Sequence, residues 1–323
     1  MTEQNEERVK VFIVTYKRTP ALHTTLRQIY DDTDFMKVYP NAEVWIINNH
    51  SQFFLHKYFV DKGVKVLHNE CRPDWSCGNL GRNWNEALLH GFKNLREPDA
   101  DIVVTLQNDV IFHPEWGSNL KKMLEKYTFV VGSIGDSVCA WRPEAVKKIG
   151  LWDERFVSIS HKEADYYIRA IMHNKEKSCI GDVAHKRFLN AQDYLPLETH
   201  QNHDQEWVEL RDDTRHNDAW LHSTQIFYHK WKDTWKEQPS FDGWLINWTD
   251  DFVENPPTDP KVPNYMHYWY FEKDVENLSG KNYVGFREGD LWLTMKQGSG
   301  DIDQKPNGYE GRDLGWGTPD EKS

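Results

Sequence analysis

The stretch VKVFIVT at Val9–Thr15 determines the fold class. β-Branched and aromatic side chains fill most of its positions, which is the composition of a strand buried on both faces of a parallel sheet. Thr19 and Pro20 follow after three polar residues, and this pair is typical of a helix N-cap and first helical position. We therefore expect the chain to open with a strand that leads directly into a helix.

Strand and helix signals continue to alternate along the chain. Further strands are predicted where short apolar runs occur, at 43–48, 64–67, 102–106, 129–134, 137–141 and 178–183. Helices are predicted between them where apolar residues recur at helical spacing, at 20–30, 79–95, 116–127, 143–150 and 160–173. This succession predicts an α/β protein with a Rossmann-like, mostly parallel central sheet and helices on both faces.

The composition changes near residue 190, where histidines, acids and tryptophans replace aliphatic runs. We therefore predict a sheet domain at 8–190, an irregular, Trp-rich C-terminal region at 191–297 and an irregular tail at 298–323. Nine of the 15 tryptophans follow residue 200, and indole rings stack well on the apolar faces of sugars. These tryptophans as a group fit a saccharide site, although for any single one of them a role as an aromatic core residue is favoured.

Charge and cysteine content exclude several classes of protein. The formal net charge is −12, so the chain lacks the basic surface of a nucleic-acid-binding protein. Its four cysteines form no CxxC pair and no disulfide framework, which favours a reducing compartment. The N-terminus is polar and no apolar run is long enough to cross a bilayer, so we expect a cytoplasmic enzyme without a transmembrane segment.

Polar residues follow each of the first strands, where ligands of open parallel sheets bind. They lie at Thr15–Arg18, Asn48–Ser51, Asn79–Asn83 and Gln107–Asp109. The first strand is not followed by GxGxxG, and the chain contains no GxxxxGK[ST]. Classical dinucleotide binding and P-loop phosphate transfer are therefore disfavoured.

The order of these motifs resembles that of the glycosyltransferase-A (GT-A) fold, and in particular the inverting family 2 glycosyltransferases. The resemblance covers about residues 8–190 and is carried by five segments: VFIVTYKR, WIINNHS, NLGRNWNEAL, VVTLQNDVIFHPEW and IGLWDERFVSISHKEADYYIR. It implies a transferase that moves a sugar from a nucleotide diphosphate sugar, with a UDP-sugar favoured, to a saccharide acceptor. The inverting course is implied by the analogy alone.

The resemblance also implies a divalent cation, Mn²⁺ or Mg²⁺, that neutralises the diphosphate leaving group. The family's Asp-x-Asp aligns with Gln107 and Asp109, so Asp109 is the expected carboxylate ligand and Gln107 would contact ribose or metal. His185 is the expected imidazole ligand, with His200 and His203 as a weaker alternative pair. Asp109 as an ordinary turn residue and His185 as a surface histidine remain open alternatives.

The attacking acceptor hydroxyl must lose a proton to a base. Glu163 falls on the family position of that base, and Asp165 is the reserve candidate. Ser160 and Glu163 also match a capping box, in which Glu163 would only fix the start of a helix. Asp153 and Glu154 are lesser candidates for the base.

The remaining expected contacts divide between donor and acceptor. The nucleotide sugar is assigned to polar residues at the strand ends: Thr15, Tyr16, Arg18, Asn48, Asn79, Arg82, Gln107 and Asn108. Arg82 is equally compatible with a solvated helix position. The acceptor is assigned to Trp141, Arg142 and Trp231. Two other functions stay open, a non-catalytic saccharide-binding protein and a sugar nucleotidyltransferase, although the latter would want a glycine-rich loop after the first strand.

Overall fold

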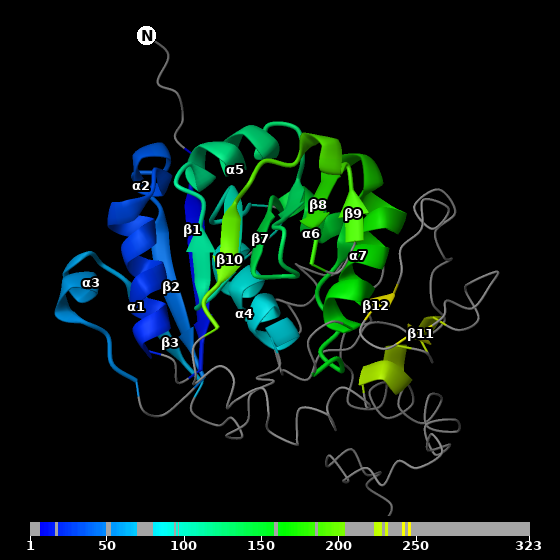
Figure 1. Ribbon diagram of the computed structural model, residues 1–323, viewed down its shortest axis with the longest axis horizontal. Helices are drawn as coiled ribbons and strands as arrows, with labels where there is room; N and C mark the ends of the chain where they lie inside the picture. The colour runs from blue at the N-terminus through cyan, green and yellow to red at the C-terminus, as the bar shows by residue number, and fades with distance from the viewer. Residues whose placement is uncertain are drawn as a thin grey trace, which may run out of the picture.

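The computed structural model describes residues 7–16, 19–49, 53–69, 80–93, 95, 97–157, 161–184, 187–203, 223–227 and 230–231, and the backbone of 241–242 and 245–246. Its centre is an eight-stranded sheet in the order β3-β2-β1-β4-β7-β6-β8-β9 (Figure 1). The strands are β1 (Val9–Thr15), β2 (Glu43–Asn48), β3 (Lys65–His68), β4 (Ile102–Gln107), β6 (Phe129–Val131), β7 (Val138–Trp141), β8 (Ser178–Asp182) and β9 (Arg187–Leu189). The predicted α/β class is confirmed.

The strands β3, β2, β1 and β4 run in the same direction, so their carboxyl ends lie at one edge of the sheet. β1 pairs in parallel with both β2 and β4, and β2 pairs in parallel with β3. In this register Thr15 lies opposite Asn48, Asn48 lies opposite His68, and Val14 lies opposite Gln107. Only β7 and β9 run against the common direction of the sheet.

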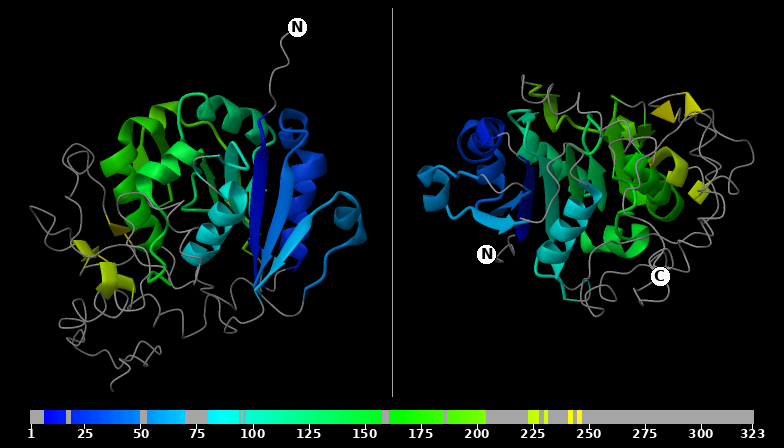
Figure 2. Two further views of the ribbon diagram at one scale, coloured as in Figure 1. Left: turned by 180° about the vertical axis from the view of Figure 1, so that it is seen from behind. Right: turned by 90° about the horizontal axis from the view of Figure 1, so that it is seen from below.

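Helices cover both faces of the sheet, as the two views of Figure 2 show. One face carries α1 (Thr19–Arg27), the π-helix η1 (Gln28–Asp32), α2 (Phe35–Val38), α3 (Lys57–Asp61) and α5 (Trp116–Leu124). The other face carries α4 (Leu80–Phe92), α6 (Pro143–Ile149) and α7 (His161–Asn174). The 3₁₀ turns η2 (Lys175–Lys177) and η3 (Ala191–Asp193) flank β8 and β9.

Alternation along β1 explains why the sheet has two cores. Val11 and Ile13 belong to the cluster with α1 and α5, whereas Phe12 and Val14 belong to the cluster with α4 and α7. Successive side chains of a strand point to opposite faces, so a run that is apolar throughout buries both. All seven residues of β1 are buried, as the VKVFIVT pattern predicts.

Parts of the predicted C-terminal region pack against the sheet domain. β5 (Val110–Phe112) pairs antiparallel with β10 (Glu198–Gln201), a strand that the sequence analysis did not predict. Residues 223–227 and 230–231 are helical, and Phe227 and Trp231 lie in the same core cluster as α7. A short ribbon joins β11 (Phe241–Asp242) to β12 (Leu245–Ile246). The predicted tail at 298–323 lies outside the described residues.

Among the helices in the described ranges, none is both long and apolar enough to span a bilayer.

Candidate active site

The ends of β1, β2 and β4 bring together three polar residues that the sequence assigns to the nucleotide. Asn108 donates from Nδ2 to Thr15 Oγ1 at 2.9 Å, and its backbone carbonyl accepts a hydrogen bond from Thr25 Oγ1 at 2.9 Å. Asn48 follows in the neighbouring strand, with Nδ2 3.2 Å from His68 Nδ1. Thr15, Asn48 and Asn108 therefore form one polar layer at the edge of the sheet.

Gln107 and Asp109 lie where the chain turns from β4 into β5, and Asp109 is only 4% exposed. Gln201 Nε2 donates to Gln107 Oε1 at 3.0 Å and lies 3.5 Å from Asp109 Oδ1. Gln107 in turn donates from Nε2 to Asp136 Oδ1 at 2.9 Å. Both ends of the Gln107 amide are therefore engaged, and the predicted contact with ribose or metal would use the second N–H or the second lone pair of the amide.

Asp136 is a central residue of this site that the sequence analysis missed. Its Oδ2 accepts hydrogen bonds from Trp84 Nε1 at 2.5 Å and from Lys162 Nζ at 2.7 Å. Burial raises the pKa of Asp136, although the ammonium of Lys162 opposes that shift. An acid after glycine in the loop between two short strands is typical of any turn. Only its place at the same edge as Gln107 indicates a role.

The expected base Glu163 lies in the first turn of α7 and belongs to the same cluster. Lys162 Nζ is 2.8 Å from Glu163 Oε1 and 2.7 Å from Asp136 Oδ2, and all three side chains are almost completely buried. Burial opposes the charge of Lys162, but the two carboxylates raise its pKa overall. We call Asp136, Lys162 and Glu163 the acid–lysine cluster. Ser160 lies outside the described residues, so the capping box stays a prediction.

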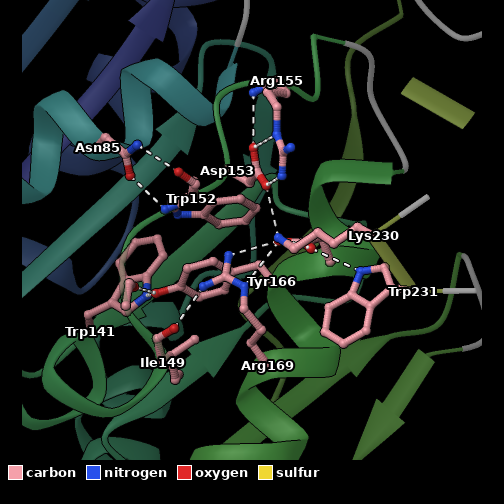
Figure 3. A network of polar contacts seen from close by, with 12 residues as sticks. Asn85, Trp141, Ile149, Trp152, Asp153, Arg155, Tyr166, Arg169, Lys230 and Trp231 are labelled. Atoms are coloured by element: carbon pink, nitrogen blue, oxygen red, sulfur yellow. Dashed lines mark hydrogen bonds and ion pairs between the residues drawn. The ribbon is translucent and has the colours of Figure 1, made fainter. Parts of the chain in front are cut away.

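Trp231 lies with Lys230 and Arg169 in a different, buried network (Figure 3). Asp165 belongs to the same network through its ion pairs and hydrogen bond. Asp165 Oδ1 is 2.6 Å from Lys230 Nζ and accepts from Trp231 Nε1 at 3.1 Å, and Oδ2 is 2.9 Å from Arg169 Nη2. Both carboxylate oxygens of Asp165 are therefore used within the fold, which makes it unsuitable as a base. Trp231 is 1% exposed, so its ring offers no surface to a sugar.

The two lesser base candidates are also engaged in the fold. Lys230 Nζ is 2.9 Å from Asp153 Oδ2, and Arg155 Nη2 is 2.6 Å from the same oxygen. Burial disfavours ionisation of Asp153, but these two cations hold its pKa well below the usual range. Glu154 Oε1 accepts a hydrogen bond from Asn85 Nδ2 at 2.8 Å. Asp153 and Glu154 are thus accounted for by packing around α4 and α7.

Lys230 joins the C-terminal helical segment to α7, and its loss would leave two buried carboxylates with one cation fewer. We expect Lys230→Met to lower the free energy of unfolding by about 3 kcal/mol or more, because breaking a buried ion pair leaves uncompensated charge. Urea unfolding followed by tryptophan fluorescence measures this change. Lys57→Met is the matched control, since its ion pair with Asp61 is exposed and is expected to contribute less than about 1 kcal/mol. Equal losses of unfolding free energy in Lys230→Met and Lys57→Met would contradict the conclusion that Lys230 stabilises the fold as a buried cation.

Trp141 and Arg142 do not lie at the nucleotide edge. In the antiparallel register of β7, Trp141 pairs with Val103, near the start of β4 and far along that strand from Gln107. Trp141 is fully buried and donates from Nε1 to Tyr166 Oη at 3.0 Å. Arg142 lines a separate cavity of about 430 Å³ and is paired with Glu7 at 2.6 Å. We therefore do not retain Trp141 and Arg142 as acceptor residues.

Five predicted residues remain to be located. Tyr16 follows β1 directly and is half-buried, and Arg82 is half-buried in the first turn of α4, next to the turn that carries Trp84. Arg18, Asn79 and His185 lie outside the described residues, so their roles stay predictions. The alternative histidines His200 and His203 are exposed on β10 and just beyond it.

A divalent cation fits this strand end if the substrate supplies most of its ligands. Within the described part of the chain, no group of three or more His, Cys, Asp or Glu side chains could hold a metal ion. Asp109 contributes one carboxylate, with the amide of Gln201 beside it. Mg²⁺ is commonly bound by one or two carboxylates together with substrate phosphates and water. The residues therefore fit a cation that is held jointly by Asp109 and a diphosphate.

No protein-family model matches the chain, and a search of curated proteins returns no match. Among solved structures, the chain is similar to glucosyl-3-phosphoglycerate synthase from Mycobacterium tuberculosis in complex with Mn²⁺, UDP-glucose and phosphoglyceric acid. The TM-score is 0.41 at 12% identity, over 67% of this chain and 79% of that chain. It is also similar to TarS from S. aureus, with a TM-score of 0.38 at 11% identity, over 68% of this chain and 43% of that chain. Identities and TM-scores this low assign no function to this chain.

Proposed function

We propose that this chain is a glycosyltransferase of the GT-A type, which moves a sugar from a nucleotide diphosphate sugar to a hydroxyl of a saccharide. The observation that carries the proposal is the hydrogen-bonded line from Gln107 through Asp136 and Lys162 to Glu163. This line connects a carboxylate of the first turn of α7 to the strand end that bears Asp109. The motif order over residues 8–190 supports the same assignment.

The donor nucleoside is assigned to the polar layer at the ends of β1 and β2. Asn48 offers both a donor and an acceptor and so complements the edge of a pyrimidine, which favours a UDP-sugar. Tyr16 and Thr15 would line the ribose side. Arg82, in the first turn of α4, would face the diphosphate, where the helix dipole also favours negative charge.

Asp109 is the residue that would hold a Mn²⁺ or Mg²⁺ ion against the diphosphate, with His185 as a further predicted ligand. When bound, such an ion neutralises the charge that develops on the departing diphosphate. The chain's own contribution is to hold the Asp109 carboxylate in place between β4 and β5. Gln201 lies beside this carboxylate and connects it to Gln107.

The transfer itself requires one bond to form and one to break at the anomeric carbon. The acceptor oxygen attacks that carbon, and the bond to the diphosphate oxygen breaks, so that the leaving nucleotide keeps the electron pair. Glu163 takes the proton of the attacking hydroxyl, and attack from the face opposite the diphosphate inverts the configuration. Lys162 fixes the orientation of the Glu163 carboxylate by donating to Oε1. The Lys162 ammonium also offsets the negative charge of the neighbouring Asp136.

A thermal-shift screen of nucleoside diphosphates, nucleotide sugars and oligosaccharides, each with and without MnCl₂, tests the proposal. We expect UDP or a UDP-sugar with Mn²⁺ to raise the Tm by about 5 °C at 100-fold excess over Kd, and other nucleotides to raise it less. Hydrolysis of the same nucleotide sugar on prolonged incubation would support transferase chemistry. A response to oligosaccharides alone would instead favour the non-catalytic saccharide-binding alternative.

A further inference from the structure

β10 lies beside the proposed donor site although it comes from the region that follows the predicted sheet domain. It pairs antiparallel with β5, the strand that begins directly after Asp109. The pairing shifts register between Glu198 and His200, as a β-bulge does. Glu198 and Gln201 would face opposite sides of a regular strand, but the irregularity allows both to reach the edge formed by β4 and β7.

Gln201 contacts the strand end that carries the proposed metal ligand. Its Nε2 donates to Gln107 Oε1 at 3.0 Å and lies 3.5 Å from Asp109 Oδ1. The Gln107 amide donates onward to Asp136 at 2.9 Å. The side-chain amides of Gln201 and Gln107 therefore donate in the same direction, toward Asp136. This orientation turns Nε2 of Gln107, and not Oε1, toward the acid–lysine cluster.

Glu198 contacts the loop that carries Asp136. Its Oε1 accepts hydrogen bonds from the backbone N–H groups of Ser133 and Ile134, and from Ser137 Oγ at 3.2 Å. A Cβ on Gly132 would come within 2.2 Å of the same oxygen, so only glycine leaves room for this contact. Burial raises the pKa of Glu198 to about 7, partly offset by these donors. The loop between β6 and β7 is thus built around the Glu198 side chain.

The contacts of Gln201 and Glu198 join β10 to two neighbouring segments of the site. Through Gln201, β10 binds the end of β4 on one side, and through Glu198 it binds the loop of Asp136 on the other. Gln107, at the end of β4, and Asp136, in the loop between β6 and β7, also hydrogen-bond to each other. Because β10 contacts both the end of β4 and the loop of Asp136, it determines how far apart these two segments lie.

We propose that Gln201 is a positioning residue for the donor site, and that β10 acts through Gln201 and Glu198 to hold Asp109 and Asp136 in fixed relation. This inference rests on the proposed function, because it concerns the same diphosphate-binding edge. Gln201 acts through Gln107 and Asp109 and needs no contact with the donor. Partners that orient a metal ligand typically change metal affinity or activity by about 10–100-fold when they are removed.

The first test compares Gln201→Met with the control Thr199→Val. Thr199 lies on the same strand but is exposed, and its hydroxyl contacts a backbone carbonyl of β5 at 3.2 Å and Nδ1 of the adjacent His200 at 3.0 Å. Titration calorimetry with UDP and MnCl₂ is expected to show about tenfold weaker binding for Gln201→Met, with unchanged affinity for Thr199→Val. Equal affinities for the wild type and Gln201→Met would overturn the inference and leave the proposed function intact. Failure of the wild type to bind any nucleoside diphosphate would overturn both.

The second test uses Gln201→Glu and the metal alone, so it needs neither donor nor turnover. A carboxylate at this position would lie close to Asp109 and give the strand end two acidic ligands in place of one. We expect Mn²⁺ titrations followed by electron paramagnetic resonance to show about tenfold tighter binding in Gln201→Glu than in the wild type. Unchanged or weaker Mn²⁺ binding would mean that Gln201 does not lie beside the metal ligand, and the inference would fail even if Gln201→Met did not fold.

Discussion

Glu163→Gln is expected to lower kcat about 10³-fold while leaving donor affinity and Tm close to those of the wild type. A positioned general base typically contributes 10²–10⁴-fold to a rate, and a glutamine cannot take the proton of the acceptor hydroxyl. The substitution keeps the shape of the side chain and one oxygen that can still accept from Lys162. Turnover by product release and donor binding by calorimetry separate the two effects.

Glu176→Gln is the control for this experiment, because Glu176 is exposed just beyond the end of α7. It is expected to leave kcat unchanged. A large fall in the Tm of Glu163→Gln with preserved kcat would show that Glu163 serves the helix start, as the capping-box hypothesis holds. The neighbouring Asp165 is not expected to replace Glu163, since its oxygens are taken by Lys230, Trp231 and Arg169.

Asp109→Asn is expected to weaken Mn²⁺-dependent binding of UDP by more than about 100-fold, because removal of a direct ligand should exceed the 10–100-fold effect of a residue that only orients one. Binding without metal should change little. The stability of the variant should change little, since asparagine keeps the shape of the side chain and an oxygen that can still accept from Gln201 Nε2, and the hydrogen bond from Asn202 N reaches the backbone carbonyl of Asp109 at 2.8 Å. Calorimetric titrations with and without MnCl₂ give both affinities.

Asp61→Asn provides the comparison for Asp109→Asn, because Asp61 is an exposed aspartate at the end of α3. Its removal should not alter the effect of Mn²⁺ on UDP binding. If Asp109→Asn binds UDP as tightly as the wild type in the presence of Mn²⁺, Asp109 is not a metal ligand. The proposal would then lose the carboxylate that it assigns to the metal.

Local sequence was sufficient for most strands and helices of the sheet domain because their signals are short-range, whereas the short elements α2, α3, β5 and β9 were not predicted. VKVFIVT is apolar on both faces and lies inside the sheet, between β2 and β4, and the helical spacing at 79–95 corresponds to α4. β10 was not predicted, since its sequence ETHQ is polar and only its pairing with β5 makes it a strand. A polar edge strand carries no hydrophobic alternation to detect.

The candidate site was predictable only in part, for the same reason. Thr15, Asn48 and Asn108 were found because they follow strands whose carboxyl ends must meet at one edge. Asp136 and Gln201 were missed because each gains its role from a partner far away in the chain, Trp84 for Asp136 and Gln107 for Gln201. Trp141 was misplaced because β7 runs antiparallel, which carries its end to the opposite edge of the sheet.

The amino-acid sequence by itself determined the layered α/β architecture and the edge at which polar strand ends collect, because burial patterns and strand ends are written in consecutive residues. Tertiary structure alone decided which acids are paired with buried cations. It gave Asp165 two buried cations and a tryptophan as partners, and it linked Glu163 through Lys162 and Asp136 to the end of β4. The charge and reactivity of a buried carboxylate depend on the cations that pack against it. Those cations come from helices and loops that are distant in sequence.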